Sequence, residues 1–323
     1  MDLTNIAIIA GYGGHSGYAY AIAYYLDQKG VKPVIYVPRG HEWIKKKLER
    51  YGIIEELTLP RKPGEPLIRT IHRWTKNLYE SLSKITRKYD AVLACGSNFS
   101  LLPALTAKLK KRKLYNLESI DRILDPSRTT RIIYKFADLT FLHWPEQKQN
   151  YPKGLVVGPV YEPPTVEPYD GGYILVTAGT LGNKELFDAL LETGLENIVL
   201  QTGNIDPNPY IERRPRWRVF RFTHEFDKLL AGARIVITQF PGMTGASAAL
   251  AYRKPVILVP GRHVPMSSRL ENAPLFAEKI GAIYVEKITP GSLLDAIDKA
   301  RKLHPPEYQN GAERIASILI GEG

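Results

Sequence analysis

Apolar runs and amphipathic segments alternate along the chain, and their order predicts an α/β fold. In the first half, short runs rich in β-branched residues predict strands over 5–10, 32–38, 91–96, 113–118, 139–144 and 154–158. Apolar residues at helical spacing predict helices over 16–29 and 42–51. Strands that alternate with helices form parallel sheets covered on both faces, so we expect a doubly wound, Rossmann-like domain.

A proline-rich stretch interrupts this pattern. Residues 159–172 (PVYEPPTVEPYDGG) suit neither a helix nor a central strand. The alternation then restarts, with strands expected over 172–180, 197–203, 217–222, 234–239, 255–260 and 282–286 and helices over 184–193, 245–252 and 307–320. We expect two doubly wound domains facing each other across a cleft, over 1–160 and 173–323, joined by a linker over 161–172. The last helix could pack on either domain.

Charge is distributed unevenly between these two halves. The chain has 323 residues and a net charge of +11, and 44% of its residues are hydrophobic, as in a globular protein. Residues 1–165 contain 26 basic and 15 acidic residues, whereas the remainder contains 18 of each, so the first half carries the whole excess. Nucleic acid is one anionic partner that such a charge fits. We do not expect it here, because no nucleic-acid-binding motif occurs and aromatic residues are not interleaved with the basic ones.

Three further features predict a cytoplasmic location. The single cysteine, Cys95, lies in an apolar run, which suits a buried thiol in a reducing compartment. The first apolar run, IAIIA, is short and follows no basic residue, so we expect a strand and not a signal peptide. No stretch approaches 18 apolar residues, and a membrane-spanning helix is therefore not expected.

The first strand leads into a glycine-rich loop, GYGGHSGY (11–18). Gly11, Gly13 and Gly14 permit positive φ angles and close backbone approach, and the helix that follows points free N–H groups at an anion. The loop does not match the dinucleotide-binding pattern, which also needs an acid at the end of the second strand. His15 is either a capping or packing residue or a group that handles a proton or contacts an anion, and we favour the second interpretation.

The second half contains three comparable loops, TAGTLGN (177–183), QTGN (201–204) and QFPGMTGASAALA (239–251). In the last of these, Gly242, Thr244, Gly245 and Ser247 place N–H groups and hydroxyls around a helix start, which predicts a diphosphate site. The alternative is that small residues there only allow a helix to pack closely on the sheet. The seven histidines are scattered, no HExxH or DxD pattern occurs, and we predict neither a metal nor a cofactor.

Taken together, these segments resemble the GT-B family of UDP-N-acetylglucosamine transferases. The resemblance rests on GYGGHSGY, ACGSNFSLLPAL (94–105), QTGN, QFPGMTGASAALAYRKPVILVP and above all the central block at 116–160, with its LES, IIYKFAD and WPEQKQNYPKG motifs. The first half is similar to the acceptor-side anchoring subunit of the eukaryotic enzyme that adds the second GlcNAc to dolichyl-diphosphate-GlcNAc. The second half is similar to its donor-binding subunit. Here the two are fused, as in archaeal relatives, in a MurG-like layout.

The resemblance implies a role for each loop. It makes His15 and Glu118 the catalytic pair, one as the base and the other orienting the acceptor, without assigning which is which. It implies an acceptor-side phosphate loop of Gly11, Gly13, Gly14, Ser16, Gly96 and Ser97. It implies a donor site of Thr180, Gln201, Thr202, Gly203, Gly242, Met243, Thr244, Gly245, Ser247 and Asn272. Three positions depart from the family pattern: Ala248 replaces an acid, Tyr161 replaces an arginine, and Glu271-Asn272-Ala273 matches a sugar-recognising loop only at Asn-Ala.

The implied activity is inverting, metal-independent transfer of GlcNAc from UDP-GlcNAc to a polyprenyl- or dolichyl-diphosphate-linked GlcNAc, with a β1-4 linkage as in N-glycan precursor assembly. Two alternatives stay open. One is another GT-B activity, such as UDP-GlcNAc 2-epimerisation, which needs no acceptor. The other is a non-catalytic membrane scaffold for a partner transferase, although this chain has its own donor-like half.

A lipid-linked acceptor requires contact with a membrane, and the segment 66–88 has the right character. Its apolar residues form one helical stripe of Leu67, Ile71, Trp74, Leu78, Leu82 and Ile85. Its basic residues are Arg69, Arg73, Lys76, Lys84, Arg87 and Lys88, beside a single acid, Glu80. Periodicity alone favours a stripe that faces the core. The local positive charge favours an anionic membrane surface, so we expect a peripheral protein on the inner face of the cell membrane, with Trp74, Arg69, Arg73, Lys76 and Leu78 among the contacts.

Overall fold

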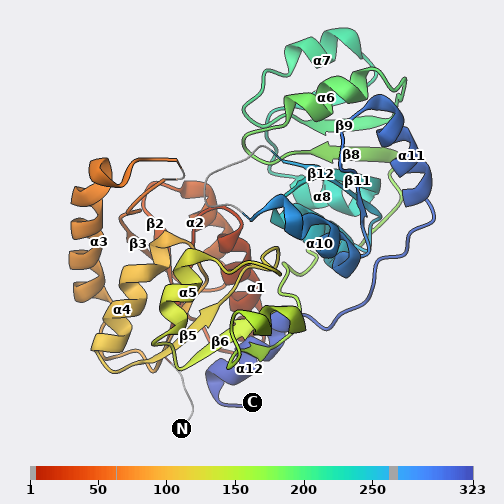
Figure 1. Ribbon diagram of the computed structural model, residues 1–323. Coiled ribbons are helices and arrows are strands. Elements are labelled where there is room, and N and C mark those ends of the chain that lie inside the picture. The colour runs from red at the N-terminus through yellow and green to blue at the C-terminus, as the bar shows by residue number, and fades with distance from the viewer. Residues whose placement is uncertain (1–4, 63, 262–267, 323) are drawn as a thin grey trace. The chain divides into compact units, whose positions relative to one another are not determined.

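The computed structural model describes residues 5–62, 64–261 and 268–322, and in this part of the chain the fold is α/β with two parallel sheets (Figure 1). The chain divides into two compact units. The first holds the described residues through Glu162, Ser268 and the C-terminal stretch from Gln309, and the second holds the other described residues between Pro163 and Tyr308. This is the architecture of two Rossmann-like domains.

The first unit is built on a seven-stranded sheet with the strand order β3-β2-β1-β4-β5-β6-β7, in which every pair is parallel. Its strands are β1 Ile6–Ile9, β2 Val34–Pro38, β3 Ile53–Leu57, β4 Ala91–Ala94, β5 Lys113–Leu117, β6 Leu139–Leu142 and β7 Leu155–Val156. Its helices are α1 His15–Gln28, α2 Glu42–Leu48, α3 Ile71–Lys84, α4 Leu101–Leu109, α5 Arg128–Tyr134 and α12 Gly311–Ile320.

The order of the strands reverses at β1, which lies between β2 and β4. All four residues of β1 are buried, because helices cover both faces of the sheet. Helices α1, α2 and α12 pack together, as do α3, α4 and α5. The loops that follow β1 and β4 leave the sheet side by side in opposite directions, which creates the crevice where ligands of such sheets bind.

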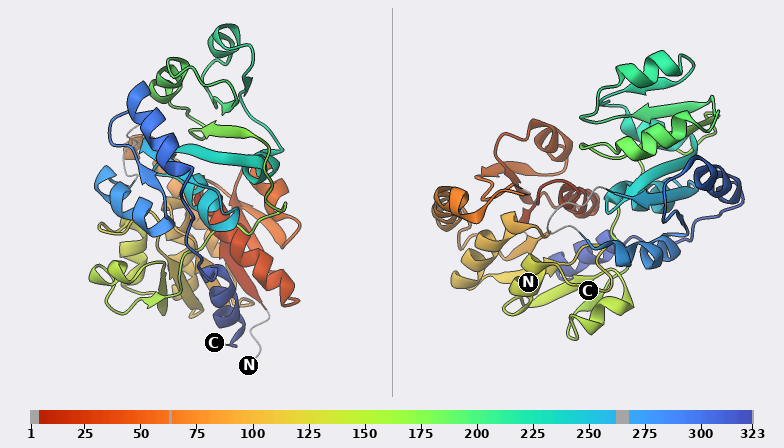
Figure 2. Two further views of the ribbon diagram at one scale, coloured as in Figure 1. Left: turned by 90° about the vertical axis from the view of Figure 1, so that its right-hand side faces the viewer. Right: turned by 45° about the horizontal axis from the view of Figure 1, so that its top comes forward.

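The C-terminal helix belongs to the first unit. Helix α12 packs along α1, as both views of Figure 2 show for the blue and red helices. It begins at Gly311 and not at 307, because the Asn310 side chain accepts a hydrogen bond from the Ala312 N–H and caps the helix. A Cβ atom at Gly311 would overlap the carbonyl oxygen of Gly158, so this junction requires glycine.

The second unit repeats the design with a six-stranded parallel sheet in the order β10-β9-β8-β11-β12-β13. Its strands are β8 Tyr173–Thr177, β9 Ile198–Gln201, β10 Arg218–Phe220, β11 Ala233–Phe240, β12 Val256–Pro260 and β13 Ile283–Tyr284. Its helices are α6 Lys184–Leu191, α7 Asn208–Arg213, α8 Phe226–Gly232, α9 Met243–Ala246 followed by one π-helical turn over Ser247–Ala251, α10 Ala273–Ile280 and α11 Pro290–Ala300.

The proline-rich stretch is not a free linker. From Pro163 onward it lies against the second unit, where the Tyr169 N–H donates to the Ala231 oxygen (2.8 Å) and the Gly171 N–H donates to the Gly232 oxygen (2.8 Å). The Lys254 ammonium group also donates to the Tyr169 oxygen (2.8 Å). The stretch therefore runs along the start of β11, held by its backbone.

Candidate functional site

His15 lies at the crevice of the first sheet. It is the first residue of α1, and its imidazole reaches across to the loop after β4, where Nδ1 lies 3.0 Å from the Cys95 carbonyl oxygen. The surrounding glycines make room for the ring. A Cβ atom at Gly11 would lie 2.5 Å from the His15 Cβ, and one at Gly96 would lie 2.8 Å from the His15 Nδ1. Glycines in the loops after two different strands, β1 and β4, thus leave the space that the His15 side chain occupies.

This contact fixes the chemistry of the ring. A carbonyl oxygen only accepts hydrogen bonds, so Nδ1 of His15 carries the proton and the neutral ring keeps a lone pair on Nε2. Burial lowers the pKa of His15 to about 4; the charge of Arg122 acts in the same direction, while the bond to Cys95 opposes it. At neutral pH the ring is therefore uncharged, with Nε2 free to accept a proton.

The other residues of the predicted phosphate loop stabilise the backbone of the loop by their φ angles and local hydrogen bonds. Gly13 has a φ of +66°, and its carbonyl oxygen accepts a hydrogen bond from the Ser16 hydroxyl (2.7 Å). Ser97 has a φ of +60°, and its Oγ accepts a hydrogen bond from the Phe99 N–H (3.3 Å). Helix α1 has no side-chain cap and no acid in its first turn, and Gly14 occupies its N-cap position. The N–H groups of Ser16 and Gly17 donate to the Gly13 and Gly14 oxygens (3.1 and 3.0 Å), and anion binding at this helix start stays a prediction.

Glu118 is buried, and both of its carboxylate oxygens accept hydrogen bonds. It follows β5, and its Oε1 accepts from the Ser119 N–H (2.7 Å) while its Oε2 accepts from the Ser127 N–H (3.0 Å) and from the Tyr151 hydroxyl. Burial raises its pKa, against the effect of these donors. The carboxylate thereby ties together the loop that leads from β5 to α5. This geometry is that of a residue that positions others.

The sequence did not single out His143, although it belongs to the same network. Its Nδ1 accepts from the Val160 N–H (3.0 Å), so its Nε2 carries the proton and donates to the Glu118 carbonyl oxygen (2.7 Å). Burial lowers the pKa of His143 to about 4. Tyr18, from α1, packs beside this ring with a centroid distance of 5.5 Å, and its oxygen accepts from the Ile120 N–H (2.9 Å). No motif in the sequence predicts these contacts, and those of Tyr18 join segments more than 100 residues apart.

The second sheet has an equivalent crevice between β8 and β11. The loop after β8 exposes Thr180, whose carbonyl oxygen accepts a hydrogen bond from the Asn204 N–H (2.8 Å) in the loop after β9. Gly203 in that second loop has a φ of +65°, and a Cβ atom there would lie 2.6 Å from the Thr180 oxygen and would overlap that of Gly179. The two predicted donor loops are therefore packed together through a glycine that no other residue can replace without strain.

Among the predicted donor residues, Gln201, Thr202 and Asn272 have largely buried side chains that bond within the protein. The amide nitrogen of Gln201 lies 3.4 Å from the hydroxyl of Thr177, and the hydroxyl of Thr202 donates to the Ile205 oxygen (2.8 Å). Asn272 precedes α10, and its amide donates to the Arg269 oxygen (3.2 Å). In this structure their side chains shape the loops, and contact with a donor remains a prediction.

The turn from β11 into α9 gives its small residues different roles. A Cβ atom at Gly245 would lie 2.8 Å from the side chain of Leu258 on β12, so this glycine lets the helix pack closely on the sheet. Gly242 is extended, with a φ of 162°, and a Cβ atom there would meet only the Gln239 oxygen, at 3.5 Å. Neither the backbone angle nor the space requires glycine at 242. Met243 and Thr244 open α9, Ser247 is largely buried in the π-helical turn, and Ala248, where the family pattern has an acid, is completely buried.

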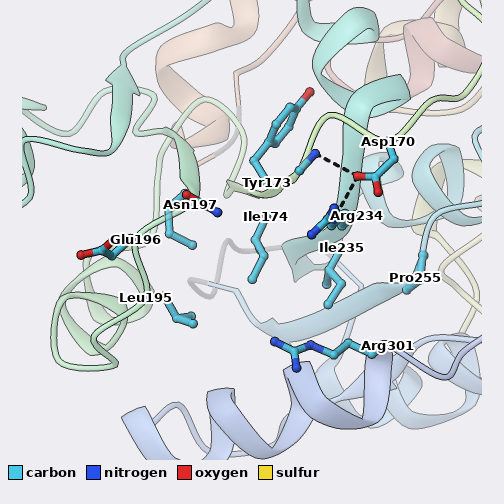
Figure 3. Close-up of a pocket in the computed structure, with 12 residues that line it drawn as sticks. Asp170, Tyr173, Ile174, Leu195, Glu196, Asn197, Arg234, Ile235, Pro255 and Arg301 are labelled. Carbon is cyan, nitrogen blue, oxygen red and sulfur yellow. Dashed lines mark hydrogen bonds and ion pairs between the residues drawn. The ribbon is translucent and has the colours of Figure 1, made fainter.

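A cavity of about 510 Å³ lies at the other edge of the second sheet (Figure 3). It is lined by residues at the amino ends of the strands, including Tyr173, Ile174 and Ile235, and Arg234 on its wall is paired with Asp170 (2.6 Å). Ligands of parallel α/β sheets bind at the carboxyl ends, where the glycine loops are. The size of this cavity is therefore not an argument for the functional site.

Helix α3 buries polar residues and exposes apolar ones. Its buried residues are polar: Asn77 donates to the Thr58 oxygen (2.6 Å), and Glu80 accepts from the Thr58 N–H (2.6 Å) and from Arg39 (2.8 Å). Its apolar residues are exposed, together with those of the preceding 3-10 turn over Leu67–Thr70; they are Leu67, Ile68, Ile71, Leu78, Tyr79 and Leu82. The prediction that periodicity alone favoured, a stripe facing the core, is wrong for this helix.

The structure also corrects details of the predicted membrane segment. Helix α3 ends at Lys84, so Ile85 is not part of the stripe but a buried core residue. Arg73 pairs with Glu65, and Lys84 pairs with Glu55 (2.6 Å), which neutralises two of the six basic residues. Trp74 is partly buried, whereas Arg69 and Lys76 are exposed beside the apolar side chains. No helix in the described part of the chain is long and apolar enough to cross a bilayer.

Comparison with known proteins places these features in context. Residues 173–318 match the glycosyltransferase family 28 C-terminal domain. The second half of the chain therefore carries a domain of the glycosyltransferase type. No curated protein matches its sequence significantly. Among solved structures, MurG of Acinetobacter baumannii has a TM-score of 0.67 and 19% identity, with 98% of this chain and 99% of that chain covered.

Epimerases share the same fold. A putative UDP-N-acetylglucosamine 2-epimerase from Listeria monocytogenes has a TM-score of 0.71 and 18% identity, with 98% of this chain and 96% of that chain covered. UDP-GlcNAc 2-epimerase from Neisseria meningitidis, bound to UDP-GlcNAc, has a TM-score of 0.64 and 15% identity, with 99% and 96% covered. At these identities the likeness shows the fold, which is GT-B, and no more. Within the described residues, no group of three histidine, cysteine or acidic side chains is placed to hold a metal ion.

Proposed function

We propose that this protein moves GlcNAc from UDP-GlcNAc to a lipid-diphosphate-linked GlcNAc with inversion at the anomeric carbon and without a metal, forming a β1-4 linkage. The observation that carries the proposal is the geometry of His15, a neutral imidazole whose Nδ1 is held by the Cys95 oxygen and whose Nε2 has no recorded partner among the described residues. The choice of UDP-GlcNAc as the donor is supported by structural neighbours that act on or bind this nucleotide sugar. The choice of a lipid-linked acceptor is supported by the resemblance of the motifs in residues 116–160.

In this mechanism His15 is the base. Its Nε2 takes the proton of the acceptor hydroxyl while that oxygen bonds to the anomeric carbon of the donor. The bond from that carbon to the phosphate oxygen breaks at the same time, and UDP leaves with the electron pair from the opposite face of the sugar. Proton transfer by a positioned side chain typically contributes about 10²- to 10⁴-fold in rate. The low pKa of His15 keeps it unprotonated, and hence ready to act, well below neutral pH.

Glu118 supports this base from a distance. Each of its oxygens accepts at least one hydrogen bond from the first domain, so the carboxylate is held in place by these contacts. By holding the N–H groups of Ser119 and Ser127, it fixes the β5–α5 loop that borders the crevice. We therefore assign proton transfer to His15 and positioning of the acceptor side to Glu118.

The second domain holds the donor through neutral groups. The loop at 178–183 and the turn at 241–248 contain no charged residue, so an anionic diphosphate there is bound by N–H groups and hydroxyls, among them those of Thr180 and Thr244. Gly242 leaves the backbone open for close approach. The same N–H groups stabilise the charge that develops on the departing UDP.

The exposed face of α3 is the membrane contact in this proposal. A face that carries four exposed bulky apolar side chains and exposed basic residues, on a helix buried through its polar side, matches an interfacial helix beneath anionic headgroups. Binding to vesicles of anionic lipid at low salt is expected to fall strongly when Ile71, Leu78 and Leu82 are all replaced by serine. Leu294→Ser, an exposed leucine of α11, is the matched control. Equal binding by both variants would remove the membrane contact from the proposal.

One assay tests the reaction itself. Purified protein is incubated with a panel of UDP-sugars and a lipid-diphosphate-GlcNAc acceptor, with and without EDTA, and the products are separated. Disaccharide formed only from UDP-GlcNAc and unaffected by EDTA is the expected result. Conversion of UDP-GlcNAc without acceptor would identify an epimerase, and EDTA-sensitive transfer would overturn the metal-free mechanism. No turnover of any donor would favour the scaffold.

A further inference from the structure

Gln239 occupies the centre of the second domain's ligand edge. It is the penultimate residue of β11. This strand lies beside β8, at which the strand order of the second sheet reverses. Its amide nitrogen donates to the Ala178 carbonyl oxygen (2.9 Å) at the start of the loop after β8. On the other side it faces Gly261, the residue after β12, where a Cβ atom would lie 3.3 Å from the Gln239 Oε1. This side chain of β11 therefore lies between the loops that follow the two neighbouring strands, β8 and β12.

The Oε1 atom of Gln239 is buried and has no hydrogen-bond partner among residues 5–62, 64–261 and 268–322. A buried amide oxygen that stays unpaired costs free energy, and most such atoms in folded proteins are paired. The amide cannot solve this by turning over, because its nitrogen would then lose the Ala178 oxygen and the oxygen would face it. The fold thus holds an acceptor in place at the ligand edge without supplying its donor.

The chemistry of the atom restricts what completes it. An amide oxygen accepts hydrogen bonds and cannot donate, so it repels the oxygens of a diphosphate. It pairs only with an O–H or N–H group. In a nucleotide sugar these are the hydroxyls of the ribose and the hexose, the uracil N–H and, in an N-acetylated sugar, the acetamide N–H.

We infer that Oε1 of Gln239 accepts a hydrogen bond from an O–H or N–H group of the bound nucleotide sugar and thereby contributes to donor specificity. This inference deepens the proposed function, since it requires a UDP-sugar in the second domain. It assigns a role to the first residue of the QFPGMTGASAALA segment, for which neither the loop pattern nor the resemblance gave one. In this arrangement the N–H groups of the loops bind the diphosphate, and Gln239 accepts a hydrogen bond from an uncharged part of the ligand.

The test compares three ligands by calorimetry: UDP, UDP-glucose and UDP-GlcNAc. Gln239→Met keeps the length of the side chain and removes the acceptor. We expect it to lose about tenfold in affinity, as a neutral hydrogen bond does. A loss confined to UDP-GlcNAc assigns the acetamide N–H, a loss for both sugars but not UDP assigns a hexose hydroxyl, and an equal loss for all three assigns the ribose or uracil. Each of these outcomes supports the inference.

Controls separate binding from stability. Gln239→Met also removes the hydrogen bond to Ala178, so its thermal unfolding is compared with that of Thr193→Ala, which loses a hydroxyl bond to the Leu190 oxygen (2.7 Å) at the end of α6. Thr193→Ala is expected to bind all three ligands like the parent. If Gln239→Met does not fold, Gln239→Asn withdraws the acceptor by one methylene and gives the same comparison. Unchanged affinity of the Gln239 variants for every ligand would overturn the inference. Failure of the parent protein to bind any UDP ligand would instead overturn the proposed function, and this inference with it.

Discussion

The two domains place very different residues at the same topological position. In the first, titratable groups with shifted pKa values lie at the carboxyl edge of the sheet, among them His15 after β1, Glu118 after β5 and His143 after β6. In the second, the crevice beside β8 is lined by glycines, hydroxyls and amides, and its loops at 178–183 and 241–248 contain no charged residue. One fold, used twice, thus gives one edge suited to moving a proton and one suited to holding an anion.

The difference has a physical cause. Burial shifts a pKa only where the side chain can ionise, so proton chemistry requires residues such as histidine inside the first domain. A diphosphate already carries its charge, and N–H dipoles at loop and helix starts bind it without a titratable partner. If this division is correct, substitutions at the two edges should separate turnover from donor affinity.

The largest expected effect is on turnover, at His15. His15→Asn keeps a side-chain donor near the Cys95 oxygen and removes Nε2, so kcat should fall by about 10²- to 10⁴-fold while the KM for UDP-GlcNAc changes little. Steady-state kinetics with both substrates measures this. His304→Asn, an exposed histidine of the second domain, is the control. If His15→Asn keeps more than a tenth of the parent's kcat, proton transfer cannot be assigned to the first domain's edge through His15.

The pH dependence tests the same residue without a mutation. His15 has a folded-state pKa of about 4, so kcat/KM should stay nearly level from pH 8 to pH 5 and fall below that. A base with the ordinary histidine pKa would already lose about 30-fold at pH 5. An acid limb at pH 6.5 would contradict the assignment.

Stability should respond over a defined pH range. His15 and His143 both have pKa values lowered to about 4 in the folded protein, so the unfolded chain binds more protons between pH 6.5 and 4. Their contribution to the free energy of unfolding is full above about pH 6.5 and is lost progressively as the pH falls toward 4. Denaturant titration at each pH separates this loss from the acid limb of the rate.

A pair of glycines in the second domain gives the next largest effect. Gly203→Ala forces a left-handed residue and a Cβ atom against the Thr180 oxygen, so it should lower the free energy of unfolding by about 2 kcal/mol. Gly242→Ala meets open space at an extended φ, so it should unfold like the parent but bind UDP-GlcNAc more weakly, because the added methyl group obstructs the diphosphate. Thermal melts and calorimetry distinguish the two. Equal donor affinity in Gly242→Ala and the parent would argue that no ligand approaches there.

The strands of both sheets could be predicted from the sequence because their signal is local. Runs such as 6–9 and 256–260 are apolar throughout, as expected of strands covered on both faces. Strand β3 was missed, because Ile53–Leu57 lies at the edge of its sheet, where two adjacent glutamates disrupt the apolar run. The loops were found through their glycines, whose backbone angles are also local.

The contacts that define the site are not local, and periodicity does not contain them. The proton on His15 is fixed by Cys95, 80 residues away, and the three donors to Glu118 come from Ser119, Ser127 and Tyr151. The amphipathic pattern of α3 predicted a stripe but not which side faces inward. That side was decided by partners for Asn77 and Glu80 at the end of β3.

The smallest expected effect comes from two helix caps, one at each edge. The Ser127 Oγ caps α5 in the first domain by accepting from the Thr130 N–H (3.2 Å), and the Asn183 Oδ1 caps α6 in the second by accepting from the Leu186 N–H (3.2 Å). Alanine at either position should cost about 1 kcal/mol in the free energy of unfolding.

Their effects on function should differ. The Asn183 amide also donates to the Pro260 oxygen (3.0 Å) and so ties the loop after β8 to the end of β12, whereas the Ser127 hydroxyl makes no such link among its described contacts. Asn183→Ala should therefore raise the KM for UDP-GlcNAc a few-fold with kcat unchanged. Ser127→Ala keeps the N–H that holds Glu118 and should leave that KM alone. If two caps of equal cost changed donor affinity equally, the binding edge would depend on general stability, and the contrast between the domains would lose its basis.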